Sequence, residues 1–198
     1  MNDKFLELAV TDSVRATQQH YYGGGARSGF SPANDAFMDD EIAFIQSRDS
    51  FYLATVSEKG WPYIQHRGGA PGFLHVLSPK QLAFADYKGN RQLLSTGNVA
   101  ANDRVCLFLM DYPLRTRLKI LGHARVSDAR EHPELLEQLA DPEARRLVER
   151  FFLIDVVSFN WNCQQHITPR FTAEEIAAAV APLKQRIAEL ESQLKGKS

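Results

Sequence analysis

The stretch "FADYKGNRQLLSTGN", residues 84–98, joins the end of a predicted strand to the start of a predicted helix. Gly89 and Asn90 are residue types that favour a backbone turn, and a helical pattern begins at Arg91. Backbone N–H groups at a helix start attract anions, and Lys88 and Arg91 add two cations beside them. The junction is therefore a candidate phosphate site. Taken alone, however, the stretch fits a solvent-facing polar helix start better.

The composition is that of a globular protein without a global charge bias. The chain has 198 residues, enough for one domain with a buried core, and 44% of them are hydrophobic. The formal net charge of −1 gives no indication of a nucleic-acid or membrane-surface partner. No apolar run reaches membrane-spanning length, and the start of the chain, with Asp3 and Glu7, does not resemble a signal peptide. Two cysteines make no disulfide framework, so we expect a cytoplasmic protein.

Short segments rich in β-branched and aromatic residues follow one another through most of the chain. Their connections are mostly short. They predict an antiparallel barrel, because closing a sheet removes its exposed edges. The predicted strands are residues 51–57, 63–67, 73–78, 81–86, 104–112, 117–127 and 150–161.

Helical patterns flank these strands. Gly, Ser and Pro residues over 23–35 predict a linker after a weakly amphipathic start, and acidic residues open a short helix over 39–49. Residues 131–149 predict helix, with Pro133 and Pro142 marking starts. The predicted organisation is an N-terminal arm with a short helix (1–38), a β domain (39–171) and a C-terminal helix (172–198).

The C-terminal segment has the pattern of a separate amphipathic helix. Thr172 and Glu175 have the spacing of a capping box, and Pro182 predicts a kink or a fresh helix start. Two interpretations stay open: the helix packs on its own barrel, or it pairs in a dimer. Apolar residues recur alternately four and three positions apart, as in a heptad repeat, at Ile176, Val180, Leu183, Ile187, Leu190 and Leu194.

Polar groups also gather at the end of the second predicted strand. The stretch "YIQHRGG", residues 63–69, carries Gln65, His66 and Arg67 just before two glycines. Such glycines let a backbone approach a flat ligand closely. A hairpin loop with incidental polar residues explains the same stretch about equally well.

Two further stretches carry candidate binding groups. Arg115, Arg117 and Lys119 occupy alternate positions, which on a strand form one face. Such a row of cations needs either solvent or an anion. The second stretch, "NWNCQQHITPRF" over 160–171, contains amides, the thiol of Cys163 and the imidazole of His166.

The order of these motifs resembles the FMN-binding split-barrel family related to pyridoxamine 5′-phosphate oxidase, and in particular its uncharacterised flavin-nucleotide-binding branch. The resemblance covers about residues 40–170 and rests on "PYIQHRGG", "FADYKGNRQ", "NDRVCLFLMDY", "RTRLKILGHARV" and "CQQHITPR". It implies a mainly β protein with flanking helices, built on a six-stranded antiparallel split barrel. It also implies a homodimer that binds FMN at the subunit interface.

The resemblance implies roles for individual residues. It places Asp86 where a strand end contacts FMN, and Asn90 and Arg91 in the turn that grips the phosphate. Arg117 falls near the polar residue that reaches FMN from the partner subunit. The candidate cofactor-binding residues are Gln65, His66, Arg67, Asp86, Lys88, Asn90, Arg91, Arg115, Arg117, Gln164, Gln165 and His166.

The chain also departs from the oxidase pattern. Its second strand contains "QHRGGA" where the oxidase has an "RxVLLK" type of segment, and Gln92 replaces the second cation of the phosphate turn. The oxidase segment that holds pyridoxal phosphate is replaced by "CQQHITPRF" and a long helix. We therefore expect a flavin-dependent oxidoreductase that acts on another small molecule, with a nicotinamide cofactor or another electron carrier as its partner.

Other functions stay open at this point. His66 or His166 could serve as an acid or base, although a structural role is the commoner one for such residues. Cys163 could be a redox-active thiol, and we expect no metal site because the sequence shows no ligand cluster. A non-catalytic flavin sensor and a haem-binding split barrel with His166 as axial ligand are the alternatives to an enzyme.

Overall fold

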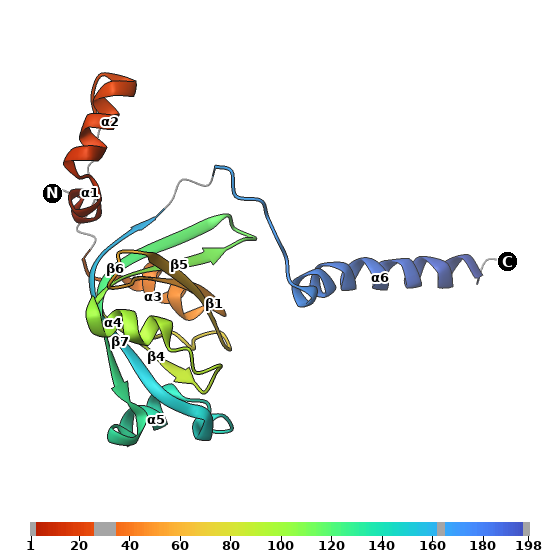
Figure 1. Ribbon diagram of the computed structural model, residues 1–198. Coiled ribbons are helices and arrows are strands. Elements are labelled where there is room, and N and C mark those ends of the chain that lie inside the picture. Colours follow the sequence, from red (N-terminus) through yellow and green to blue (C-terminus); the bar gives the residue numbers. More distant parts are fainter. Residues whose placement is uncertain (1–2, 26–34, 162–164, 196–198) are drawn as a thin grey trace. The chain divides into compact units, whose positions relative to one another are not determined.

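The computed structural model describes residues 3–25, 35–161 and 165–195, which belong to two compact units (Figure 1). One unit comprises Met1–Met110 and Arg117–Asn162, and the other comprises Asp111–Thr116 and Cys163–Ser198. The predicted linker over 23–35 falls largely on residues 26–34, which lie outside the described residues.

A seven-stranded antiparallel sheet, not closed into a barrel, dominates the larger unit (Figure 1). Its strand order is β2-β1-β5-β6-β7-β4-β3, so β2 and β3 are its two edges. The mainly β class with flanking helices is confirmed, and each segment predicted as a strand contains one. The described residues hold one strand more than the resemblance implies. The strands are β1 (Ser50–Val56), β2 (Pro62–Gly68), β3 (His75–Ser78), β4 (Gln81–Tyr87), β5 (Arg104–Asp111), β6 (Thr116–Asp128) and β7 (Val148–Trp161).

Aromatic side chains fill the space that the curved sheet encloses. Phe84 on β4 stacks on Phe152 of the neighbouring β7, with ring centroids 4.9 Å apart, and both side chains are buried. Phe51 on β1 meets Phe84 edge to face at 5.3 Å, although β1 and β4 are not neighbours in the sheet. The sheet therefore curls around its core. Burying one such ring contributes about 1.5–3 kcal/mol.

Helices flank the sheet or precede it. The helix predicted over 39–49 is confirmed, and the N-terminal segment contains two helices where we expected one. Each of these two begins at a side-chain cap, formed by Asp3 and Thr11. No helix among the described residues is long and apolar enough to span a membrane. The α-helices are α1 (Lys4–Ala9), α2 (Asp12–Tyr22), α3 (Asp39–Gln46), α4 (Leu94–Ala101), α5 (Pro133–Leu139) and α6 (Ala173–Lys195).

Two predicted helix positions were wrong. The helix expected from Arg91 begins at Leu94, because Arg91 and Leu93 adopt positive φ angles of 64° and 54°, which a right-handed helix does not allow. The segment 131–149 is helical only over α5 and two short 3₁₀ turns. Pro133 does occupy the first turn of α5, but no α-helix follows Pro142.

The C-terminal helix α6 is confirmed and continuous. Thr172 and Glu175 form the predicted capping box, each side chain accepting a hydrogen bond from the other residue's backbone N–H. Pro182 lies inside the helix and starts no new one. No side chain of α6 is buried.

Candidate functional site

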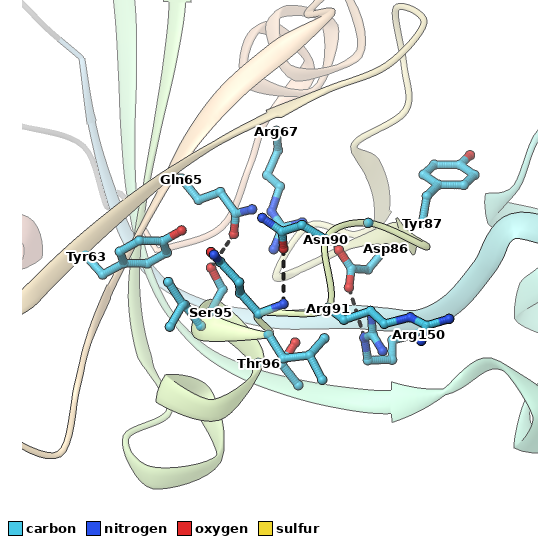
Figure 2. Close-up of a pocket in the computed structure, with 14 residues that line it drawn as sticks. Tyr63, Gln65, Arg67, Asp86, Tyr87, Asn90, Arg91, Ser95, Thr96 and Arg150 are labelled. Carbon is cyan, nitrogen blue, oxygen red and sulfur yellow. Dashed lines mark hydrogen bonds and ion pairs between the residues drawn. The ribbon is translucent and has the colours of Figure 1, made fainter.

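A polar cavity of about 230 Å³ lies beside the turn that follows β4 (Figure 2). Side chains from three distant parts of the chain form its wall. Because β2 and β4 lie near opposite ends of the sheet, the cavity depends on the curl of that sheet. The wall comprises Tyr63, Gln65 and Arg67 of β2, Asp86 and Tyr87 of β4, Gly89–Thr96 of the turn and α4, and Arg150 of β7.

Strand alternation decides which residues of β2 reach the cavity. Successive side chains point to opposite faces of a strand, so Gln65 and Arg67 share the cavity face while His66 and Ile64 share the other. His66 is exposed and meets the ring of Tyr52 edge to face at 5.6 Å. His66 therefore does not line this cavity.

A buried carboxylate links two arginines at the base of the site. Asp86, only 6% exposed, accepts a hydrogen bond from Arg67 at 2.5 Å and another from Arg150 at 3.0 Å (Figure 2). Arg150 also donates to Glu149 at 3.0 Å. A buried charge needs such partners, because leaving it unpaired costs several kcal/mol, on the order of 3–5. The network fixes the positions of both guanidinium groups.

One hydrogen-bond donor of Arg67 lacks an acceptor. Its Nε is buried and has no hydrogen-bond partner in the structure. Its guanidinium lies over the rings of Phe84 and Phe152, with centroids 5.5 and 5.3 Å away. A buried N–H without an acceptor is rare in folded proteins, and a ligand is one explanation for it.

The turn between β4 and α4 presents a further cation and several polar groups. Asn90 accepts a hydrogen bond from the backbone N–H of Gln92, and the buried Ser95 hydroxyl donates to Gln65 at 2.8 Å (Figure 2). Arg91 is exposed, and the described residues give it no ion pair. Three arginines therefore face one carboxylate in the cavity wall, a balance that favours an anionic ligand.

Two other predicted cations, Lys88 of the turn and Arg117 of β6, do not line the cavity. Lys88 is exposed and does not line the cavity, although its backbone N–H donates to the Leu147 carbonyl. The guanidinium of Arg117 lies over the Phe108 ring, 5.5 Å from its centroid. The predicted row of three cations on one strand was wrong, because Arg115 precedes β6 in a turn with a φ of 55°.

The candidates from the segment 160–171 belong to the smaller unit or lie outside the described residues. Gln165 and His166 are exposed and belong to the smaller unit, where His166 has a φ of 63°. Gln164 and Cys163 lie outside the described residues. No group of three or more potential metal ligands occurs in the described part of the chain.

A second and more open cavity, of about 500 Å³, adjoins Tyr87 on β4. Its lining includes Phe73, His75 and Leu139. Burial lowers the pKa of His75, and a hydrogen bond with the Leu139 backbone opposes this shift. Burial also raises the pKa of the Cys106 thiol on β5, which makes it less reactive than a free cysteine.

Comparison with known proteins identifies the fold family. The family model described as pyridoxamine 5′-phosphate oxidase matches residues 38–161, well over half of the chain. The chain belongs to the pyridoxamine 5′-phosphate oxidase family. Members of this family usually bind a flavin nucleotide and are commonly dimeric. No curated protein matches the chain.

Solved structures resemble this chain at low sequence identity. A candidate pyridoxamine 5′-phosphate oxidase from Lactobacillus delbrueckii has 19% identity and a TM-score of 0.51, over 64% of this chain and 94% of that one. HupZ from Group A Streptococcus has 13% identity and a TM-score of 0.49, over 68% and 100%. A protein from Clostridium acetobutylicum related to general stress protein 26 has 17% identity and a TM-score of 0.45, over 69% and 94%. The likeness to the Lactobacillus structure, at 19% identity, shows the fold alone.

Within this family fold, the cavity includes residues that sequence reasoning missed. Ser95 and Thr96 follow the turn directly, and their hydroxyls extend its polar pattern, so the sequence held a signal for them. Tyr63 shares the period-two pattern of Gln65 and Arg67. Arg150 carried no local signal, because it follows Asp86 by 64 residues and meets it only in the fold.

Proposed function

We propose that this protein binds FMN with its phosphate in the cavity between β2, the turn after β4 and the start of β7. The observation that carries the proposal is the buried Arg67 Nε without a hydrogen-bond partner, in a wall of three arginines and one carboxylate. Arginine forks suit phosphate oxygens, and the Thr96 hydroxyl adds a neutral donor. The donor set therefore fits a phosphate monoester.

The size of the cavity limits which part of FMN it holds. At about 230 Å³ it is smaller than the roughly 300–1,000 Å³ of pockets that enclose a drug-sized ligand. It has room for the phosphate and part of the ribityl chain. The isoalloxazine ring then lies outside the cavity and needs further protein surface to cover it. A second subunit would supply that surface.

A homodimer would cover the exposed face of β1, β2 and β5. Tyr52 and Ile64, 39% and 64% exposed, lie on this face, and Phe108 pairs with Tyr52 across the β1–β5 ladder. Exposed apolar side chains in such a group favour a protein interface. Arg117, over Phe108, would lie in that interface, where the family resemblance places a residue that reaches the partner's FMN.

We propose further that the protein is an oxidoreductase. FMN supplies hydride and electron transfer when bound, and the residues of this chain bind, orient and shield it. Asp86 holds Arg67 and Arg150 in place, so the wall is organised before a ligand arrives. A small molecule other than pyridoxamine phosphate is the proposed substrate, with a nicotinamide cofactor as the electron donor.

FMN and riboflavin titrations of matched variants test the phosphate site. Arg91→Ala should weaken FMN binding about tenfold to a hundredfold, because a charged hydrogen bond contributes about 1.5–3 kcal/mol. The same change should leave riboflavin binding unaltered, since riboflavin has no phosphate. Lys88→Ala, which removes the other cation of the same turn at a position outside the cavity wall, is the control. Equal losses for both variants would overturn the proposed placement.

Spectra then separate the enzyme from its alternatives. Bound FMN that is bleached by NADH or NADPH without oxygen would support an oxidoreductase. Bound FMN that neither nucleotide reduces would favour a flavin sensor. A Soret band in the purified protein, with no FMN binding, would instead identify a haem protein.

A further inference from the structure

An apolar stripe runs along α6, a helix with no buried side chain. The four-and-three spacing assigns Val180, Ile187 and Leu194 to heptad position a, and Ile176, Leu183 and Leu190 to position d. All but Val180 are large side chains between 43% and 68% exposed. Isolated exposed leucines are ordinary, but a continuous stripe at heptad spacing favours a partner helix.

We propose that α6 pairs with α6 of a second copy of this chain as a parallel two-stranded coiled coil. This pairing extends the homodimer proposed above and does not require bound flavin. In parallel coiled coils, β-branched residues at a and leucine at d favour two strands. Val180 and Ile187 at a, and Leu183 and Leu190 at d, follow this rule through the centre of the stripe.

The charges beside the stripe agree with a parallel arrangement. Arg186 occupies position g, and Glu191 occupies the following position e. In a parallel pair, position g of one helix faces position e of the next heptad in the other helix. Two-fold symmetry therefore places this opposite-charge contact on both sides of the coiled coil. Within one chain Arg186 contacts Glu189 at 3.0 Å, an exposed pair at position c that the contact with Glu191 of the second copy would replace.

Pro182 is compatible with this pairing. It occupies heptad position c, on the outer side of a two-stranded coil, so its ring would not enter the interface. Its missing N–H weakens the helix that contains it. The part of α6 that follows Pro182, Leu183–Lys195, is short enough to be marginal as an isolated helix in water, and burying its apolar stripe against a partner stabilises it.

Disulfide trapping tests the pairing and its direction in the full-length chain. In a background with Cys106→Ala and Cys163→Ser, Leu194→Cys places a thiol at position a near the end of the helix. A parallel pair brings the two thiols together, whereas an antiparallel pair places them at opposite ends. Ser192→Cys, at the outer position f, is the matched control. Under mild oxidation we expect a covalent dimer for Leu194→Cys and only background for Ser192→Cys.

Analytical ultracentrifugation of the same proteins shows whether they are monomers or dimers in solution, which decides how each cross-linking result is interpreted. A dimer in solution without a Leu194→Cys cross-link would overturn the coiled coil and leave the proposed sheet interface standing. A monomer in solution would overturn both. As a second test, Leu183→Asp with Leu190→Asp should raise the dimer dissociation constant at least tenfold. Gln185→Asp with Ser192→Asp adds the same charge at position f and should leave the constant within threefold; equal effects of both pairs would contradict the proposal.

Discussion

Arg67 on β2 donates a hydrogen bond to Asp86 on β4, and this ion pair joins strands from near opposite ends of the seven-stranded sheet. Behind it, Phe51 and Phe84 make the corresponding contact in the core. An open sheet thus encloses a core without a closed hydrogen-bond ladder. The same ion pair forms part of the cavity wall, so the stability of the sheet and the shape of the site depend on one contact.

Replacing the central carboxylate should destabilise the protein strongly. Asp86→Asn removes the charge that Arg67 and Arg150 share, and leaves two largely buried guanidinium groups without a counter-charge between them. Breaking a buried ion pair from one side costs about 3–5 kcal/mol, and the retained amide oxygen places the expected loss near the lower end. Urea denaturation followed by circular dichroism measures the free energy of unfolding.

An exposed aspartate on β7 supplies the control for that change. Asp155 pairs with Arg125 at 2.8 Å, and both side chains are more than half exposed. Surface pairs contribute about 0–1 kcal/mol, so Asp155→Asn should alter the free energy of unfolding by no more than that. If Asp86→Asn cost no more than Asp155→Asn, the proposed structural role of the Arg67–Asp86–Arg150 network would be wrong.

Glycine substitutions test the packing of the sheet against that of a helix. A Cβ added at Gly122 on β6 would lie 2.8 Å from the Asp155 carbonyl oxygen and 2.8 Å from Ile154 Cγ2. Gly122→Ala should therefore cost about 1–3 kcal/mol, as overpacking does. At Gly97, inside α4, an added Cβ would meet nothing within 4 Å. Gly97→Ala should stabilise the protein by about 0.5–1 kcal/mol.

Thermal unfolding of both variants checks that one substitution destabilises the protein and the other stabilises it. A change of 1 kcal/mol shifts the midpoint by about 2–4 °C in a protein of this size. Gly122→Ala should lower the midpoint and Gly97→Ala should raise it. The register of β6 and β7 is irregular between Leu121 and Gly122. If Gly122→Ala melted at the same temperature as the unsubstituted protein, the two strands would have moved apart there to make room for the added Cβ, and the predicted overpacking would be wrong.

The elements that sequence reasoning located correctly are those with local causes. The burial of β5 alternates residue by residue, with Val105, Leu107 and Leu109 inside, so its own composition predicts it. The residue at which α4 begins is not set by local composition. The left-handed conformations at Arg91 and Leu93 are set by the surrounding fold, since neither residue type favours them.

The same distinction between local and long-range causes applies to the residues of the candidate site. Gln65, Arg67, Asp86, Asn90 and Arg91 come from two local motifs and lie together in the cavity wall. Arg150 joins them only through the pairing of β4 with β7, where Asp86 and Arg150 are register partners. A contact over that sequence distance depends on sheet order, which periodicity does not specify.

His75 should make stability depend on pH in the mildly acidic range. Burial lowers its pKa in the folded protein below the ordinary value of about 6.5. Between the folded and the unfolded pKa, the unfolded chain therefore binds more protons than the folded chain. The free energy of unfolding then rises with pH in this window. The contribution of His75 is fully present above about pH 6.5 and declines as the pH falls toward the folded pKa.

Urea denaturation of the unsubstituted protein and of His75→Gln, at intervals from pH 7.5 to pH 5, measures this contribution. Other titrating groups are common to both proteins, so the difference in the free energy of unfolding isolates the His75 imidazole. We expect the advantage of the unsubstituted protein to shrink as the pH falls. His66→Gln changes an exposed imidazole on β2 and serves as the control for a histidine outside the second cavity. A difference that stays constant across the range, or grows toward pH 5, would show that His75 is not held in its neutral form by burial.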